Sequence, residues 1–534
     1  MSYSDIPILP ELTFDNLGEI MYRQKGETSS ERTVIPMLWH GFARMQISAG
    51  GRKRSACIYV PQGTPQGSMF VLLNIPSGYE TETFLRKSGW LHQADLHHIC
   101  LFAAEPEQGS WGADAEELPY LQACLEAEHT GVYFRGGLCV YAAGYGRTGT
   151  LLHRVVLLNP LRIAAAAFVN ASPAEDPELE NCRQMTFSRP GRLYTQKIAD
   201  IPVPVLHMEA SSDADEEITK KVSSFLMQYA RYGADGPGAN LLCPHVSFDQ
   251  PSIRFRYFTD RNGIRREFLE YIPEAVQKSG KKAPLVLAFH GISESVRNYF
   301  ELSQWQSIAD REGFVLVMPE AQLIRIPLWL TGGIAKADRA GWFVTEPERR
   351  HTDLEYVEEL LDLLETDSPV DPRRFYCTGH SMGCMMTNYI ATERFSSRFA
   401  AFGATSGILW EGSPVHLSST EIPMFMTMGE YDLWDYDPDR PGPLSESLAF
   451  WKTHNHLCDK TDADHPDTGC AREETEDGRY HHIIWNNKAG VPLLRYTWVQ
   501  GKEHMNTPAE NSLLWYTWFS HWELDENGKR RYIP

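Results

Sequence analysis

Short apolar segments alternate with amphipathic segments along most of the chain. Residues 285–289 (Leu-Val-Leu-Ala-Phe) and 314–318 (Phe-Val-Leu-Val-Met) are continuous apolar runs, which are typical of strands buried on both faces. Residues 353–364 instead repeat their apolar positions at the spacing of a helix with one buried face. This alternation predicts an α/β fold, in which helices flank both faces of a mainly parallel sheet.

The same series of segments occurs twice. Residues 54–61 (Arg-Ser-Ala-Cys-Ile-Tyr-Val-Pro) resemble residues 266–273 (Arg-Glu-Phe-Leu-Glu-Tyr-Ile-Pro), and an apolar strand follows each. Further pairs keep this order: 89–95 with 304–310, 99–106 with 314–319, 138–144 with 375–379, 162–168 with 398–402, and 204–208 with 423–427. We therefore predict two tandem domains, residues 1–245 and 246–534, with Gly- and Pro-rich linker chemistry near 235–252. The alternative is two unrelated α/β domains that share only a strand–helix rhythm.

The pentapeptide Gly379-His380-Ser381-Met382-Gly383 fits the pattern G-x-S-x-G. An apolar strand precedes it and a helical segment follows it, so Ser381 is predicted at a sharp strand-to-helix turn. Such a turn exposes the hydroxyl as a nucleophile and leaves the Met382 N–H at a helix N-terminus, where it can stabilise an oxyanion. The alternative is a tight turn with a buried, unreactive serine.

A serine nucleophile needs a base, and the base needs an acid to orient it. In this kind of elbow fold the chain order is Ser, then acid, then His. Asp432 follows the apolar strand 424–428 and is the predicted acid, with Glu430 and Asp435 as rivals in the same loop.

His504 lies in a glycine-containing loop after the apolar strand 492–500, which is where the base is expected. Four other histidines are less suitable. His481 and His482 lie within a strand-like segment, His521 lies on an amphipathic helix, and His380 points away from the serine in this motif.

The segment His290-Gly291 ends the first strand of the second half, so the N–H of Gly291 or Ile292 is the predicted second oxyanion donor. Side chains at the predicted sheet-end loops are expected to line the substrate pocket: His290, Trp342, Phe343, Trp410, Tyr431 and Trp434. Packing of these aromatic rings in the core is the alternative.

The first half lacks this chemistry. Alignment of Gly144 with Gly379 places Gly146 at the position of Ser381, and Asp213 keeps the position of the acid. A glycine has no oxygen to attack a carbonyl, so we predict a degenerate, non-catalytic first domain with a structural role. Thr148 or Ser172 as a displaced nucleophile is the weaker alternative.

Composition limits the partners. A formal net charge of −20 disfavours nucleic acid and anionic membrane surfaces, and no apolar run approaches the length of a membrane span. The N-terminus lacks the pattern of a signal peptide and the ten cysteines are scattered, which favours a cytoplasmic protein with free thiols, Cys458 and Cys470 included. The alternatives are a secreted protein whose signal peptide was removed, and a disulfide bridge between Cys458 and Cys470. We expect no metal site and no cofactor, since the acidic segment 462–467 lacks the spacing of a calcium loop. Homo-oligomer formation stays open.

The segments 284–291, 309–320 and 369–376, together with the elbow, resemble the polyhydroxybutyrate depolymerase and feruloyl or acetylxylan esterase-like family of α/β hydrolases. The resemblance covers most of residues 255–522. It implies that the second domain hydrolyses carboxylic esters without a cofactor through Ser381, Asp432 and His504. Together with the repeated series of segments, it predicts two tandem α/β-hydrolase domains, of which the first is degenerate.

The predicted activity is that of a serine ester hydrolase acting through an acyl-enzyme on aryl, hydroxycinnamoyl or hydroxyalkanoate-type esters. Two alternatives are open: a serine peptidase of the prolyl-oligopeptidase type, and a catalytically silent binding or scaffold protein. The chain shows no propeller-like repeat, and the histidine that a silent protein would lack is present.

Overall fold

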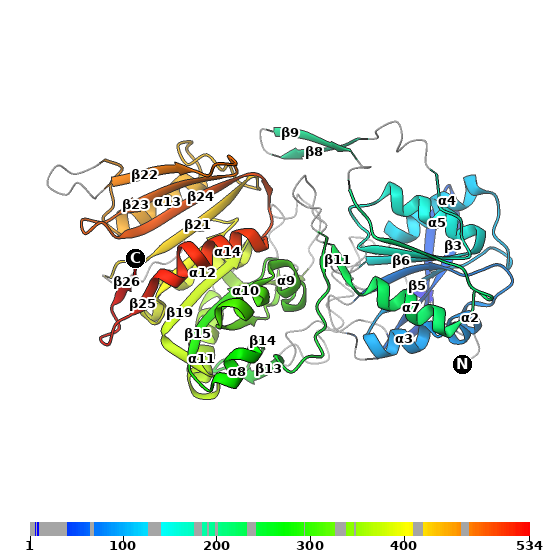
Figure 1. The fold of residues 1–534 in the computed structure, drawn as a ribbon, viewed down its shortest axis with the longest axis horizontal. Coiled ribbons are helices and arrows are strands. Elements are labelled where there is room, and N and C mark those ends of the chain that lie inside the picture. The colour runs from blue at the N-terminus through cyan, green and yellow to red at the C-terminus, as the bar shows by residue number, and fades with distance from the viewer. Residues whose placement is uncertain are drawn as a thin grey trace. The chain divides into compact units, whose positions relative to one another are not determined.

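The computed structural model describes residues 6, 8–9, 40–62, 64, 69–126, 140–175, 184–189, 192–197, 201–231, 242–292, 294–325, 338–345, 349–409, 420–460 and 469–534. The chain divides into two compact units, with the main boundary between Val246 and Ser247. Each unit is built on its own mixed, mainly parallel sheet (Figure 1). The predicted α/β fold class is confirmed.

The sheet of the second unit contains ten strands in the order β13-β14-β16-β15-β19-β20-β21-β24-β23-β22. Its parallel centre runs from β16 to β24, and antiparallel strands close both sides. The strands are β13 (Ile253–Thr259), β14 (Arg265–Tyr271), β15 (Ala283–Phe289), β16 (Val315–Pro319), β19 (Val370–His380), β20 (Ala401–Thr405), β21 (Met424–Tyr431), β22 (Gly469–Glu474), β23 (Tyr480–Asn486) and β24 (Pro492–Glu503).

Helices cover both faces of this sheet because its central strands are apolar on both sides. On one face, Phe375 and Cys377 of β19 share a core with helices α11 (Arg350–Asp367), α12 (Met382–Ala391) and α13 (Pro443–His454). On the other, Tyr376 packs against Trp515 of α14 (Pro508–Thr517) and against Phe519. Helices α8 (Glu274–Ser279), α9 (Val296–Ser303) and α10 (Trp305–Glu312) complete the set, with the short strand pairs β17 (Gln322–Arg325) with β18 (Asp338–Gly341) and β25 (Trp522–Leu524) with β26 (Arg530–Tyr532).

The sheet of the first unit has the order β1-β2-β3-β5-β4-β6-β7-β10. Helices again lie on both faces: α4 and α5 pack on one, and α2, α3 and α7 on the other. Its strands are β1 (Ile8–Leu9), β2 (Gly41–Ala49), β3 (Arg52–Val60), β4 (Phe70–Asn74), β5 (Cys100–Ala104), β6 (Val140–Tyr145), β7 (Ala165–Val169) and β10 (Val205–Met208). Its helices are α2 (Thr81–Lys87), α3 (Trp90–His97), α4 (Asp114–Glu126), α5 (Gly146–Leu158) and α7 (Glu216–Leu226). The remaining strands form the pairs β8 (Gln184–Arg189) with β9 (Arg192–Lys197) and β11 (Tyr229–Arg231) with β12 (Leu242–Pro244).

The two sheets share a seven-strand arrangement. The order β2-β3-β5-β4-β6-β7-β10 corresponds strand for strand to β13-β14-β16-β15-β19-β20-β21, and every neighbouring pair has the same direction. This shared order is what a tandem duplication would produce. The second sheet continues through β24, β23 and β22, whereas the described part of the first sheet ends at β10.

A buried ion-pair cluster ties the edge of the second sheet to α11. Arg266 of β14 is completely buried, and its guanidinium donates to Asp260 at 2.7 Å and to Asp353 of α11 at 2.7 Å. Asp353 also accepts the N–H of Phe343 at 2.6 Å. The cluster therefore anchors the segment around Phe343 against the sheet.

We expect Arg266→Met to destabilise the second unit by about 3–5 kcal/mol, because it leaves two buried carboxylates without their cation. Calorimetric unfolding of the full chain checks this, since the transition of the second unit should move to lower temperature. Arg261→Met, which removes an exposed ion pair with Glu359, is the matched control and should change little. An equal effect of the two substitutions would contradict the role of the cluster.

Candidate active site

Ser381 lies between β19 and α12 on a sharp turn. Its backbone has φ +56° and ψ −118°, a conformation that residues with a side chain rarely adopt. The flanking glycines allow it: a Cβ on Gly383 would lie 2.1 Å from the carbonyl oxygen of Phe289, and one on Gly379 would lie 2.3 Å from that of Gly383. The predicted strand–turn–helix elbow is therefore present, and both glycines are required by close backbone contacts.

The structure brings Ser381, His504 and Asp432 together. The distance from Ser381 Oγ to His504 Nε2 is 2.8 Å, and that from His504 Nδ1 to Asp432 Oδ1 is 2.7 Å. An ionised Asp432 can only accept, so Nδ1 carries the proton and Nε2 is left to accept the hydroxyl proton of Ser381. This arrangement is able to make serine nucleophilic.

Asp432 is held in its ionised form. It is 2% exposed, and burial alone would raise its pKa. The charges of His504 and Lys502, with hydrogen bonds from His504 and Ser406, outweigh burial and hold the pKa of Asp432 well below its usual range. The N–H groups of Leu433 and Gly429 also point to this carboxylate, at 2.7 Å and 3.3 Å.

The rival carboxylates of the same loop are engaged elsewhere. Glu430 Oε2 accepts the N–H of Gly501 at 2.8 Å, and the exposed Asp435 pairs with Arg440 at 3.0 Å. Of the three acids considered from the sequence, only Asp432 contacts His504.

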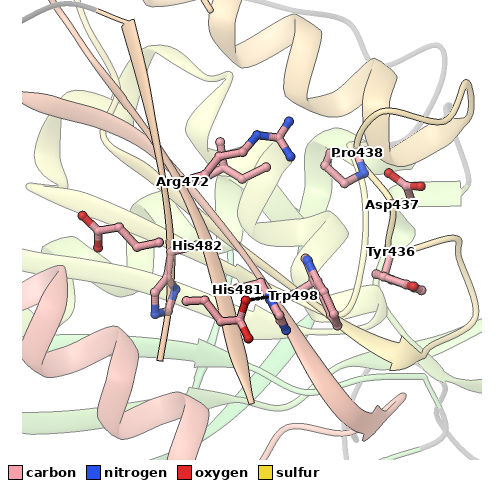
Figure 2. Close-up of a pocket in the computed structure, with 10 residues that line it drawn as sticks. Tyr436, Asp437, Pro438, Arg472, His481, His482 and Trp498 are labelled. Carbon is pink, nitrogen blue, oxygen red and sulfur yellow. Dashed lines mark ion pairs between the residues drawn. The ribbon is translucent and has the colours of Figure 1, made fainter. Parts of the chain in front are cut away.

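The rival histidines also have other partners. His481 and His482 line a polar pocket of about 440 Å³ on the β22–β24 side of the sheet, and no triad residue lines it (Figure 2). There the His481 ring is stacked on Trp498 with centroids 3.7 Å apart, and His482 contacts the hydroxyl of Thr497 at 2.8 Å. His521 lies in a short 3-10 helix and contacts two backbone carbonyls.

His380 is buried beside the triad. Its ring centroid is 4.9 Å from that of His504, and neither of its nitrogens has a hydrogen-bond partner in the described part of the chain. Burial, followed by the charges of His504 and Lys502, lowers its pKa well below the usual range. His380 is therefore a neutral neighbour and does not contact Ser381 as a base.

The loop after β15 differs from the prediction in one respect. The N–H of Gly291, one predicted oxyanion donor, donates to Glu294 Oε2 at 2.7 Å. That carboxylate closes the loop on itself, so Gly291 is already engaged. Burial raises the pKa of Glu294, although the hydrogen bond from Gly291 opposes this shift. Met382 is the first residue of α12, so its N–H has no partner in the helix ladder.

Three of the predicted pocket residues do not line an open pocket. Trp342 and Phe343 are 0% exposed and belong to the core, because the Arg266–Asp353 cluster pulls their segment inward. His290 is also 0% exposed: its Nδ1 contacts the carbonyl of Gly291 at 2.7 Å and its Nε2 accepts the N–H of Ala321 at 3.1 Å. The pocket prediction was wrong for these three.

The other residues predicted at the pocket and the oxyanion site lie in different surroundings. Trp434 is half-buried and its ring meets that of His504 edge-on, with centroids 5.8 Å apart. Tyr431, also half-buried, ends β21 directly before the acid. Half-buried Ile292 packs at the margin of the core, and Trp410 lies outside the described residues.

Trp342 nevertheless has a clear structural role beneath the site. Its indole N–H donates to the carbonyl of His290 at 2.8 Å, and its backbone N–H lies 3.3 Å from the sulfur of Met382. It therefore supports the oxyanion loop and the elbow from below.

Sequence analysis did not identify Glu294, Lys502 and Ser406 as members of the site. Lys502 and Glu294 lie within three residues of His504 and Gly291, so proximity along the chain was the available signal. Ser406 is distant in sequence from every motif and follows β20, and only the strand order places it beside Asp432.

The first unit retains the shape of the elbow without its chemistry. Gly146 stands between β6 and the body of α5 with φ +58°, close to the +56° of Ser381. The Cβ that Gly146 lacks would lie 4.0 Å from Asp213 Oδ2. Of the two displaced candidates, Thr148 is buried within α5, and Ser172 accepts at its carbonyl from Thr150.

The described residues hold no group of three or more His, Cys, Asp or Glu side chains placed for a metal ion. No helix among them is both long and apolar enough to cross a membrane. Cys458 and Cys470 are free thiols. The acidic segment 462–467 lies outside the described residues.

Comparison with known proteins identifies the C-terminal half. The Esterase family profile matches residues 261–470. The chain is 23% identical over 267 residues to the bifunctional acetylxylan esterase/xylanase XynS20E of Neocallimastix patriciarum, covering 49% of this chain and 34% of that protein. It is 27% identical over 128 residues to poly(3-hydroxyalkanoate) depolymerase C of Paucimonas lemoignei, covering 23% of this chain and 27% of that protein. The chain thus spans about a third or less of the length of these relatives.

Solved structures are similar over the same half. The acetyl xylan esterase of Aspergillus awamori aligns with 50% of this chain and 99% of its own, at 16% identity and a TM-score of 0.36. The LpqC poly(3-hydroxybutyrate) depolymerase of Bordetella parapertussis aligns with 52% and 93%, at 15% identity and a TM-score of 0.32. Residues 261–470 thus match the Esterase family profile, and the C-terminal half of the chain is similar to acetylxylan esterases, feruloyl esterases and polyhydroxybutyrate depolymerase.

Proposed function

We propose that the second unit is a serine carboxylic ester hydrolase with Ser381 as nucleophile, His504 as general base and Asp432 as the orienting acid. The observation that carries this proposal is the unbroken hydrogen-bond chain from Ser381 Oγ through His504 to Asp432, set on a strained elbow. A buried serine in an ordinary tight turn has no need of such a chain.

The geometry supports a two-step reaction. Ser381 Oγ attacks the ester carbonyl while His504 Nε2 takes its proton, and the carbonyl electrons move to the oxygen. The N–H groups of Met382 and Ile292 are the proposed donors to that oxyanion, since Gly291 is engaged by Glu294. The imidazolium gives its proton to the leaving alcohol, and an acyl-enzyme forms. Water, deprotonated by His504, then attacks the acyl carbon, and Ser381 Oγ leaves with the proton.

We propose that the substrate carries an aryl or hydroxycinnamoyl group that packs against Trp434. This ring already meets His504 edge-on, so a planar group beside the reacting carbonyl would contact it. The alternative is a hydroxyalkanoate-type ester, which one curated relative suggests by its name. The rates of hydrolysis of methyl ferulate, aryl acetates and short 3-hydroxybutyrate oligomers distinguish the two. Trp434→Ala should lower kcat/KM only for the aryl substrates.

Ser381→Ala and His504→Ala should lower kcat by about 10⁶-fold, and Asp432→Asn by about 10⁴-fold, because the acid only orients and stabilises the imidazolium. Steady-state ester hydrolysis by variants with wild-type melting curves is the measurement. His481→Ala, a substitution in the pocket of Figure 2, is the matched control and should retain activity. Wild-type turnover by Ser381→Ala would reject the proposed function.

Glu294→Gln should raise kcat/KM by about tenfold at alkaline pH and leave it unchanged at acid pH. Glutamine can still accept the N–H of Gly291, but it carries no negative charge. The ionised Glu294 present at alkaline pH repels the nearby oxyanion by roughly 1–3 kcal/mol, whereas the protonated Glu294 present at acid pH does not. The pH profile of kcat/KM tests this, with Glu474→Gln in the Figure 2 pocket as control. The same ratio of rates at every pH would assign Glu294 to loop closure alone.

We also propose that residues 1–245 form a non-catalytic structural domain. Gly146→Ser in the full chain carrying Ser381→Ala should restore no hydrolysis, because a serine on this elbow would lie near an acid, Asp213, while we expect no histidine in the first unit to act as its base. Assay of the double variant beside Ser381→Ala measures this. Turnover gained from Gly146→Ser would reveal a base in the first unit and contradict the assignment.

A further inference from the structure

A buried lysine lies directly behind the triad. Lys502 is 2% exposed at the end of β24, two residues before His504. Its ammonium donates to Ser406 Oγ at 2.7 Å and contacts the carbonyl of Glu503 at 3.3 Å. A buried ammonium is costly unless its charge is balanced. The groups that surround Lys502 therefore indicate what it does in the site.

Ser406 connects this lysine to the acid. An ammonium has no acceptor, so Ser406 Oγ must accept from Lys502, and its own proton is then free to be donated. Ser406 is also among the groups that lower the pKa of Asp432, so its hydroxyl lies near that carboxylate. Lys502 thus contacts Ser406 beside the acid, and hydrogen bonds connect Asp432 through His504 to Ser381.

The backbone around this contact is closely fitted. Ser406 has φ +54° and its N–H donates to the carbonyl of Thr427 at 2.8 Å. Gly429, which precedes the acid loop, packs so tightly on β24 that a Cβ would lie 2.3 Å from the carbonyl oxygen of Lys502. The lysine is therefore held in place from three elements: β20, β21 and β24.

The first unit provides an internal comparison. Asn170 follows β7 as Ser406 follows β20, with φ +52°, and its side-chain amide donates to Asp213 Oδ1 at 2.8 Å. The donor to the acid is thus present in both units. Among the residues that the structure describes, however, only the second sheet continues into a further strand at this edge, and that strand leads to Lys502 and His504. Lys502 and the proposed base His504 therefore occur together at the end of the same strand.

We infer that Lys502, acting through Ser406, is a positioning residue of the proposed esterase: it holds Ser406 beside the Asp432 carboxylate and so fixes the acid that orients His504. This inference rests on the proposed function.

Other charged groups face this network. Burial lowers the pKa of Lys502, and the charges of the carboxylates Asp432, Glu510 and Glu503 oppose this lowering. Glu294 faces His504 from the oxyanion loop, and His380 is a neutral neighbour. Apart from Lys502 and Ser406, none of these groups is altered in the variants below, so a change in rate reports those two residues.

The test measures how fast diisopropyl fluorophosphate inactivates the full-length protein between pH 5 and 9. This reaction consumes the hydroxyl of Ser381 with loss of fluoride, needs His504 unprotonated, and requires no knowledge of the natural ester. Lys502→Met should slow this inactivation by about tenfold, because Ser406 then loses its hydrogen bond to the ammonium and Asp432 is held less firmly. Ester hydrolysis should slow by a similar factor.

Two substitutions at Ser406 test whether the lysine acts through this side chain. Ser406→Ala should slow both reactions by a similar factor, because it removes the hydroxyl that Lys502 holds. Ser406→Asn should recover most of the rate, because the first unit uses asparagine at the matching position. Exposed Lys488→Met is the control and should match the wild type.

The outcomes are distinguishable. If the wild type does not react with the fluorophosphate, the proposed function fails. If the wild type reacts and folded Lys502→Met keeps the wild-type rate, this inference is overturned. If Lys502→Met does not fold, Ser406→Ala decides, and an unchanged rate in that variant overturns the inference.

Discussion

The site depends on one constraint, the close approach of three backbone segments: the end of β15, the end of β19 and the start of α12. The carbonyl of Phe289 and the peptides of Gly379 and Gly383 leave no room for a Cβ, and the chain can turn from β19 into α12 only with Ser381 at positive φ. This strain turns the hydroxyl toward His504, and it persists because the apolar strands below are packed on both faces. The indole N–H of Trp342 stabilises the segment after β15 by donating a hydrogen bond to the carbonyl of His290.

Charge balance in a nearly dry site is the second constraint. Asp432 and Lys502 are both about 2% exposed, and neither would remain ionised there alone. With Ser406 beside the lysine and His504 beside the acid, each charge has an opposite charge or a hydrogen-bond partner nearby. The position of the acid is therefore set by its surroundings on three strands as well as by its own loop. This explains why Glu430 and Asp435, two and three residues away along the chain, take no part.

Local sequence patterns were sufficient to predict the α/β class and the elbow. They also pointed to Ser381, His504 and Asp432, which the structure brings together. Each of these features depends on a short segment whose residue types can be recognised directly in the sequence. The pocket was less predictable. Trp342 and Phe343 follow a sheet end, as pocket residues do, but a buried contact between Arg266 and Asp353, far apart in sequence, draws them into the core. The contact between Glu294 and Gly291 was equally hidden, since a carboxylate three residues from a glycine has many possible partners.

The two units together show which features belong to the fold and which to the chemistry. The first unit keeps the positive φ at Gly146, the contact between Asn170 and Asp213, and a close glycine pair: a Cβ on Gly149 would lie 2.8 Å from the carbonyl carbon of Gly144. None of these depends on a nucleophile, so the elbow and the held acid are products of strand and helix packing. What the second unit adds is the continuation of its sheet through β24. That strand brings the base and the buried lysine to an elbow and an acid that the packing had already placed.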